Sequence, residues 1–317
     1  MTVFDVFNGD ADGLCALQQL RLSEPCDSKL VTGVKRDIAL LERVQGRAGD
    51  QVTVLDVSLD RNRGPLVELL ESGVCIRYFD HHFPGEIPEH PLLDVRIENL
   101  PDTGTSLLVD EHLGGAHRAW AVVGTFGDNF DATARQAAEP LGVSAEGLAL
   151  LQELGILLNY NGYGATVDDL HVPPDALFRR IAPYADPLAF VHEDEAFAVL
   201  RDGYSEDMHK ARAVKADVRT DFHAVVVLPA QPWARRVGGV YANELAQAAP
   251  NRAHALLTQL PEKGYVVSVR APLATKDGAD RLCRQFPTGG GRKAAAGINH
   301  LPEADLGRFV DAFIAAF

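Results

Sequence analysis

The chain has 317 residues, is 46% hydrophobic and carries a formal net charge of −14 at pH 7. This length favours about two domains, and no apolar run is long enough to span a bilayer. The acidic balance argues against a protein that holds long duplexes by phosphate neutralisation, because such proteins are usually basic. A phosphate-bearing substrate would therefore have to be bound by metal ions or by a local cluster of Arg and Lys.

The cysteines and the N-terminus favour a cytoplasmic protein. The four cysteines are scattered along the chain, at Cys15, Cys26, Cys75 and Cys283. They form no C-x-x-C pair, which favours buried free thiols in a reducing compartment. Aspartates near the N-terminus interrupt any apolar segment of the kind a signal peptide needs.

Strand-like and helical segments alternate in the first half of the chain. We expect strands at Val3–Phe7, Lys29–Val34, Gln51–Leu55 and Val74–Phe79. We expect helices from Leu14 onward and at Ile38–Val44, Gly64–Ser72 and Thr105–Leu113. A further buried apolar element covers Ala119–Phe126, and Phe130–Tyr160 is helical. This βαβα order predicts an α/β protein with a doubly wound parallel sheet.

A second, smaller α/β unit follows a linker. Prolines interrupt the chain after His171, and the charged stretch Glu193–Val218 is helix-prone. The expected elements beyond it are strands Phe222–Leu228, Ala253–Leu257 and Tyr265–Arg270, helices Val240–Ala248 and Ala304–Phe317, and a glycine-rich turn at Gly289–Gly291. We therefore expect domains at 1–190 and 221–317, joined by a linker helix region at 191–220.

The stretch Asn8-Gly9-Asp10-Ala11-Asp12-Gly13 has the opening spacing of a calcium-binding EF-hand loop. The twelfth position of that loop needs a bidentate Glu, but it is Gln19 here. The segment before the motif is also a strand, whereas an EF-hand loop follows a helix. The motif therefore lies on a strand-to-helix turn, where α/β proteins place their chemistry.

Acidic and imidazole side chains follow four of the expected strands or apolar elements. They are Asp10 with Asp12, then Asp56, then Asp80-His81-His82, and finally Asp128. The carboxyl ends of parallel strands share one edge, so these side chains should converge. Carboxylates with imidazoles suit Mn²⁺, Fe²⁺ or Zn²⁺, and this many donors suit a two-metal centre with a bridging carboxylate. Taken alone, Asp56 or Asp128 would more simply be the N-cap of the next helix.

In this order, the four groups of acidic and imidazole residues resemble the four motifs of the DHH phosphoesterase superfamily. That superfamily includes RecJ exonucleases, nano-RNases, cyclic-di-AMP phosphodiesterases and family II inorganic pyrophosphatases. The segments Val267–Arg270 and Gly289–Gly297 resemble the DHH-associated substrate-binding domain. The resemblance covers nearly the whole chain. It implies a catalytic DHH domain joined by a linker helix to a smaller α/β substrate-binding domain.

The resemblance implies two divalent ions, most commonly Mn²⁺, with Mg²⁺ and Co²⁺ as alternatives. Asp10, with Asn8 beside it, would bind the first ion. Asp56 would bridge both ions and help to hold the nucleophilic water. The remaining ligands of the second ion would be Asp12, His81 and Asp128.

The resemblance also implies groups that contact the substrate. His82 would contact the scissile phosphate or the leaving oxygen, while Asp80 would orient an imidazole. In the second domain, Arg270 would clamp a phosphate. Backbone N–H groups of Gly289, Gly290 and Gly291, next to Arg292, would form an anion-binding nest. The alternative for these glycines is a flexible turn without a ligand.

Two positions depart from the family pattern. Asn8 stands where RecJ-like members carry Asp, and a neutral amide is expected to weaken the first metal site. Arg292 stands where the family usually has His after the glycines. Arg is permanently charged and forked, so Arg292 is expected to shift specificity towards a terminal phosphate.

These features together predict a metal-dependent hydrolase, either a phosphodiesterase or a phosphatase. The expected substrates are short oligonucleotides, dinucleotides or nucleoside bisphosphates. Long nucleic acid is less favoured, because the chain shows little of the basic and aromatic interleaving that strand tracking uses. The alternatives are a pyrophosphatase or exopolyphosphatase, and a non-catalytic nucleotide-binding protein. The sequence predicts no membrane partner and leaves open whether the chain forms a homodimer.

Overall fold

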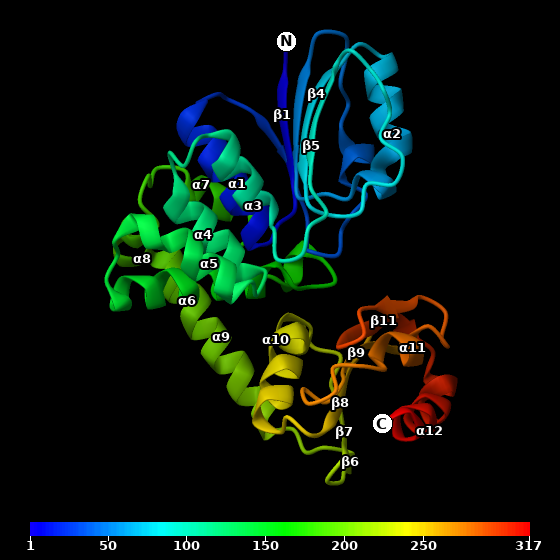
Figure 1. The fold of residues 1–317 in the computed structure, drawn as a ribbon. Helices are drawn as coiled ribbons and strands as arrows, with labels where there is room; N and C mark the ends of the chain where they lie inside the picture. The colour runs from blue at the N-terminus through cyan, green and yellow to red at the C-terminus, as the bar shows by residue number, and fades with distance from the viewer. The chain divides into compact units, whose positions relative to one another are not determined.

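The computed structural model describes all residues from 1 to 317 (Figure 1). The chain divides into two compact units, Met1–Asp202 and Gly203–Phe317. The boundary between them falls within helix α9 (Glu195–Ala213). None of the helices has the length and apolar character needed to cross a membrane.

The first unit is built on a sheet of five parallel strands, ordered β2-β1-β3-β4-β5. The strands are β1 (Val3–Phe7), β2 (Lys29–Val31), β3 (Gln51–Leu55), β4 (Cys75–Asp80) and β5 (Leu93–Ile97). The central strands are buried apolar runs, as expected for strands covered on both faces. The expected α/β fold with a parallel sheet is confirmed, and β5 is an additional edge strand.

Helices cover both faces of this sheet (Figure 1). On one face, α2 and the 3-10 turn η1 lie over a core that includes Val52, Val54 and Leu66. On the other face, α1 packs against α3, α4 and α6. The helices of the unit are α1 (Ala11–Ser23), α2 (Leu59–Glu71), α3 (Thr105–His112), α4 (Arg118–Gly127), α5 (Asp131–Ala138), α6 (Ala145–Gly162), α7 (Pro174–Ile181) and α8 (Pro187–Glu193), with 3-10 turns η1 (Leu40–Arg43), η2 (Glu139–Leu141) and η3 (Val167–Asp169).

Several expected boundaries in this unit were wrong. The helix expected at Ile38–Val44 is only the 3-10 turn η1. Helix α1 begins at Ala11 rather than Leu14, because the Asp10 side chain caps its first N–H groups. Helix α2 begins at Leu59 rather than Gly64 and contains Pro65 in its interior. By contrast, the buried apolar element expected at Ala119–Phe126 is confirmed, and it is helix α4.

The second unit contains a mixed sheet of six strands, ordered β10-β11-β9-β8-β7-β6. Only β7 and β8 are parallel. The strands are β6 (Val218–Arg219), β7 (His223–Leu228), β8 (Ala253–Gln259), β9 (Tyr265–Arg270), β10 (Gly289–Gly291) and β11 (Ala295–Leu301). The helices are α10 (Pro232–Ala248), α11 (Ala279–Cys283) and α12 (Leu306–Ala316), with the 3-10 turn η4 (Glu303–Asp305). Phe309 and Phe313 of α12 are buried in the core of this unit.

The three glycines at 289–291 form an edge strand, not the expected turn. They pair with Ala296–Ile298 of β11 in antiparallel register. A Cβ atom on Gly289 would lie 1.8 Å from the carbonyl oxygen of Cys283. Glycine is therefore required at this position because α11 and β10 approach so closely.

Candidate metal centre

The sheet of the first unit gathers the expected residues at its carboxyl edge. Asp10 follows β1, Asp56 follows β3, and Asp80 is the last residue of β4. Because β1, β3 and β4 are neighbours and parallel, these positions end side by side. Asp10 and Asp56 line a pocket of about 240 Å³, and the other residues that line it are Asn8, Lys35, Asp37, Ile38, Val57, Ser58, Arg61, His81, His82 and Asp128.

Asp56 has an unusual backbone conformation. Its φ is +57°, in the left-handed region that residues with a Cβ seldom adopt. Its N–H donates to the carbonyl of Phe79, and its carboxylate accepts from the Thr105 hydroxyl at 3.3 Å. The N-cap of α2 is Ser58, so the alternative role of Asp56 as a helix cap does not apply. Strained backbone of this kind is concentrated at functional sites.

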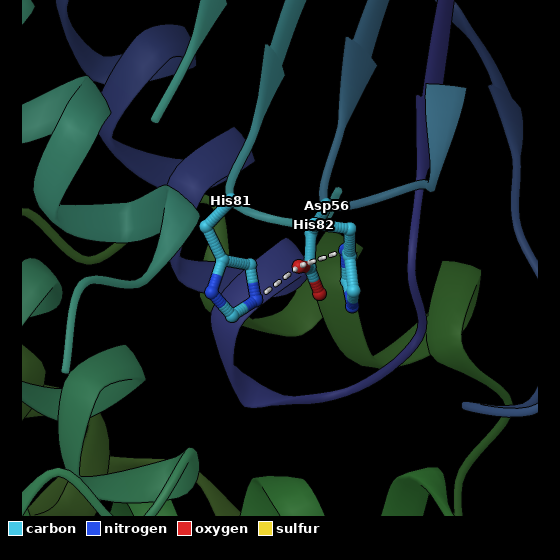
Figure 2. A group of neighbouring side chains, drawn as sticks. All are labelled: Asp56, His81 and His82. Carbon is cyan, nitrogen blue, oxygen red and sulfur yellow. Dashed lines mark ion pairs between the residues drawn. The ribbon is translucent and has the colours of Figure 1, made fainter. Parts of the chain in front are cut away.

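His81 is oriented so that one ring nitrogen faces the carboxylate of Asp56 (Figure 2). Its Nδ1 donates to the carbonyl oxygen of Thr103 at 2.7 Å. Its Nε2 lies 3.6 Å from Asp128 and 3.4 Å from Asp56. The same nitrogen is 4.0 Å from Asp12. A hydrogen bond on one nitrogen that directs the other towards anionic donors is the arrangement of a metal-binding histidine.

Asp12 links this group to the start of α3. Its carboxylate accepts from the N–H groups of Thr105 at 2.6 Å and Ser106 at 2.8 Å. Asp12 therefore satisfies N–H groups that the first turn of a helix leaves free, and it meets the positive end of the helix dipole. Burial and the nearby charge of Asp128 nevertheless raise the pKa of Asp12 to about 6.

Asp128 is the C-cap of α4, while the N-cap of the following helix is Phe130. A role as the N-cap of that helix is therefore excluded. Asp128 reaches the site because α4 ends beside the carboxyl edge of the sheet. Atoms of Asp12, His81 and Asp128 lie within 4.8 Å of one another, as do atoms of Asp56, His81 and His82.

His82 is held by the residue that ends β4. Its Nδ1 donates to Asp80 at 2.7 Å, and the same oxygen of Asp80 accepts from the N–H of His81. The side chain of His82 is 45% exposed. Burial by itself would lower the pKa of His82, but the hydrogen bond to Asp80 and the charge of Asp56 raise it to about 9. Asp80 therefore fixes both the orientation and the proton of this imidazole.

The centre carries more negative charge than its side chains neutralise. The pKa of Asp56 is raised well above its usual value by burial and by the charges of Asp10 and Asp12. Burial would lower the pKa of His81, but the hydrogen bond to Asp56 and the surrounding carboxylates raise it to about 10. A divalent cation among these groups would offset this repulsion. His81 belongs to both groups of donors, Asp12–His81–Asp128 and Asp56–His81–His82. Carboxylates combined with an imidazole in this way fit such an ion.

Asp10 has a different environment. One carboxylate oxygen caps α1 by accepting from the N–H groups of Asp12 and Gly13. The other oxygen lies 2.5 Å from Nζ of Lys35. Lys35 comes shortly after strand β2, just as the aspartates of the site come at the ends of their own strands. This place after a strand is the only feature of the sequence that indicates a role for Lys35 in the site. Asn8 is also buried at the pocket, with its side-chain amide donating to the Lys35 carbonyl at 3.3 Å.

The structure also brings together the residues of the second unit that were expected to bind phosphate. Arg270 at the end of β9 pairs with Ala295, and Gly291 of β10 pairs with the adjacent Ala296. Arg292 continues from β10 at the exposed end of this hairpin. The guanidinium of Arg270 is held by Asn243 at 2.7 Å. Arg270, Gly289, Gly290, Gly291 and Arg292 therefore lie on three neighbouring strands or their ends.

No protein-family model matches the sequence, and no curated protein sequence matches it. Solved structures do match. The exonuclease RecJ bound to manganese is 21% identical with a TM-score of 0.63, and the alignment covers 99% of this chain and 89% of that one. RecJ from Thermus thermophilus in complex with Mn²⁺ is 21% identical with a TM-score of 0.62. That alignment covers 99% of this chain and 51% of RecJ, so the chain spans about half of that protein.

A third match is the pGpG-specific phosphodiesterase PggH from Vibrio cholerae. It is 13% identical with a TM-score of 0.58, and both chains are covered completely, at 100%. The chain thus has the same fold as RecJ and PggH, as the DHH resemblance implied. At such low identities the match establishes the architecture, and the activity has to be argued from the residues of the site.

Proposed function

We propose that this chain, which has the DHH fold, is a metal-dependent phosphoesterase. It hydrolyses phosphodiester or phosphomonoester bonds in short oligonucleotides, dinucleotides or nucleoside bisphosphates. The observation that carries the proposal is His81, whose Nε2 faces the carboxylates of Asp12, Asp56 and Asp128 while its Nδ1 is fixed by a carbonyl oxygen.

The proposed ligands of a divalent ion are Asp12, Asp56, His81 and Asp128. A bound ion would supply a water of lowered pKa and would neutralise charge on the phosphate oxygens. Manganese is the first candidate, because carboxylates combined with an imidazole suit it and the matched RecJ structures contain it. The four proposed ligands lie on α1, after β3, after β4 and at the end of α4.

His82 is proposed to act on the leaving group. Its Nδ1 is held by Asp80, and its exposed side chain leaves Nε2 free to contact a phosphate or a leaving oxygen. In the metal-free chain, the hydrogen bond to Asp80 and the charge of Asp56 raise the pKa of His82 to about 9, which favours the protonated imidazole. A protonated imidazole beside the scissile bond can neutralise the leaving oxygen, which is general acid catalysis.

A small substrate is favoured over a long strand. The pocket of about 240 Å³ suits a phosphate group and its flanking sugars. Its basic side chains are Lys35, Arg61, His81 and His82, whereas the whole chain carries a net charge of −14. A small local group of basic side chains in an acidic protein suits a short anionic ligand better than a long polyanion, which needs an extended basic track. The similarity to a protein described as pGpG-specific is consistent with this choice.

The proposal is tested by one chromatographic assay in the presence of Mn²⁺. The substrates are pApA, pGpG, a short RNA, a longer single-stranded DNA, cyclic-di-AMP, 3′-phosphoadenosine 5′-phosphate and pyrophosphate. We expect hydrolysis of at least one short nucleotide and a loss of roughly 10³-fold or more in Asp56→Ala. The matched control is Asp94→Ala, because Asp94 is exposed on β5 and does not line the pocket.

Each alternative has its own outcome in this assay. Cleavage of pyrophosphate alone would identify a pyrophosphatase. If no substrate is hydrolysed but Asp56→Ala still binds nucleotide with unchanged affinity, the chain is a binding protein and the proposed activity is wrong.

A further inference from the structure

The side chain of Lys35 is held among the carboxylates of the candidate metal centre, where a fixed positive charge is unexpected. Its Nζ is 2.5 Å from Asp10 and 3.3 Å from Asp128. It also donates to the side-chain oxygen of Asn159 at 2.9 Å. These three partners come from the start of α1, the end of α4 and the last turns of α6. The ammonium group is therefore coordinated from three separate elements.

The backbone holds Lys35 in this position. Its N–H donates to the carbonyl oxygen of Gly162 at 2.8 Å, at the end of α6. A Cβ atom on Gly162 would be 3.0 Å from Cβ of Asp10, so the loop, α6 and the start of α1 are closely packed. The ammonium group also lies 5.6 Å from the ring centroid of Tyr163, within the range of a cation–π contact. The side chain is thus a built part of the site rather than a mobile surface lysine.

Asn8 supports the position of Lys35. Its side-chain amide donates to the carbonyl oxygen of Lys35 itself, at 3.3 Å. An aspartate at position 8 could not donate this hydrogen bond, and its charge would face a carbonyl oxygen. The neutral amide at position 8 and the lysine at position 35 therefore support each other. Together they replace a carboxylate with a neutral group and add a positive charge beside Asp10.

Asp10 consequently has little capacity left for a metal ion. One oxygen accepts two backbone N–H groups, and the other accepts from Lys35. A divalent ion bound to the second oxygen would be forced close to the ammonium group, and the two like charges would repel each other. By contrast, Lys35 makes no hydrogen bond or ion pair with Asp12 or His81. It contacts Asp128 through Oδ1, whereas Oδ2 of Asp128 lies 3.6 Å from Nε2 of His81, so the group around His81 remains available to an ion.

We propose that the ammonium group of Lys35 takes the place of one of the two ions, so that the chain binds a single divalent ion through Asp12, Asp56, His81 and Asp128. This inference rests on the proposed function, because it concerns the same centre. The residues fit one ion and do not fit the second. Lys35 supplies a positive charge and hydrogen-bond donors for a phosphate oxygen, but unlike a metal ion it cannot activate water.

Metal stoichiometry tests this inference without relying on activity. The full-length wild type and its variants are titrated with Mn²⁺ by calorimetry, and the bound ions are examined by low-temperature electron paramagnetic resonance. We expect one ion per wild-type chain, with the spectrum of an isolated Mn²⁺. Lys35→Ala, and Asn8→Asp combined with Lys35→Ala, should each bind two ions and give the spectrum of a coupled pair. Lys35→Arg keeps the charge and should bind one.

The control is Lys29→Ala, because Lys29 is exposed at the other end of the second strand and should leave the count at one. Two coupled ions in the wild type would overturn the inference, and hydrolysis by that same sample would leave the proposed function standing. A count of one in both Lys35→Ala and the double variant would overturn it as well. Wild type that binds no ion and hydrolyses nothing would instead refute the proposed function, and the inference with it.

Discussion

Asp56 combines two unfavourable features in a single residue. Its backbone lies at φ +57°, and its buried carboxylate faces those of Asp10 and Asp12. Neither feature helps the chain to fold, since left-handed backbone and like charges both cost free energy. A residue that is costly for folding and central to a site is typical of a trade-off between stability and function.

The trade-off predicts that Asp56→Asn stabilises the metal-free protein. Asparagine adopts left-handed backbone readily and removes one buried charge, so we expect a gain of roughly 1 kcal/mol at pH 8 in urea unfolding with a chelator. Because the pKa of Asp56 is raised on folding, the folded state binds more protons than the unfolded state above pH 3.8. Its stability therefore falls as pH rises, and the gain from Asp56→Asn should shrink towards pH 4.

Asp94→Asn provides the control for this effect, since Asp94 is exposed on β5 and should change the unfolding free energy by less than about 0.5 kcal/mol at either pH. Lower stability of Asp56→Asn at pH 8 would contradict the argument. It would show that Thr105 and the backbone depend on the carboxylate more than its neighbours repel it.

At the scale of elements, the start of α3 is part of the metal centre. Gly104 is the N-cap of α3, and Asp12 accepts from the two N–H groups that follow it. A Cβ atom on Gly104 would lie 3.0 Å from the nearest oxygen of Asp12. The φ of Gly104 is −107°, so an alanine is acceptable to the backbone. The three atoms nearest to this Cβ all belong to the carboxylate of Asp12, so the substitution would press on that carboxylate.

Gly104→Ala should therefore weaken Mn²⁺ binding about tenfold, a change of about 1.4 kcal/mol, because the carboxylate is displaced by a few tenths of an ångström. The measurement is the Mn²⁺ dissociation constant by calorimetry. Gly64→Ala is the matched control, because nothing lies within 4 Å of a Cβ there and the position is helical. Equal dissociation constants for wild type and Gly104→Ala would mean that Asp12 is not a ligand.

The elements predicted well from the sequence are those with a strong apolar pattern. The strands expected at Val3–Phe7, Gln51–Leu55 and Tyr265–Arg270 have the same bounds in the structure. Strand β5 is not among the expected strands, although Leu93–Ile97 alternates apolar and charged residues with the period of a half-exposed edge strand. Strand β10 was expected to be a turn, since glycines alone carry no side-chain signal and tertiary packing against Cys283 decides their conformation.

The site residues, too, could be predicted from the sequence only where a local pattern indicates them. Strand-end aspartates and histidines could be assigned to one edge from topology alone, because the carboxyl ends of parallel strands converge. Lys35 could not be assigned to the site in this way. Its contacts depend on Asp128 and Asn159, whose positions are set by the C-terminal ends of α4 and α6. Such contacts join residues 93 and 124 positions apart. No local pattern encodes them.

At the scale of the whole molecule, the two units carry different parts of the proposed function. Every proposed metal ligand belongs to Met1–Asp202, whereas Arg270 and Arg292 belong to Gly203–Phe317. The two sheets have separate cores. A change in the second unit should therefore alter how substrate is held and leave metal binding intact.

Arg292→Ala tests this division. Arg292 is exposed beside β10 and has no role in the core of its unit. Loss of a charge-assisted hydrogen bond to phosphate should raise KM about tenfold or more, while the Mn²⁺ stoichiometry stays that of the wild type. Steady-state kinetics on the best nucleotide substrate gives the first quantity, and calorimetry gives the second. Arg281→Ala, which removes only an exposed ion pair with Asp277, should change neither. A fall in kcat at unchanged KM would instead place Arg292 in the chemical step, because only an interaction confined to the transition state behaves in that way.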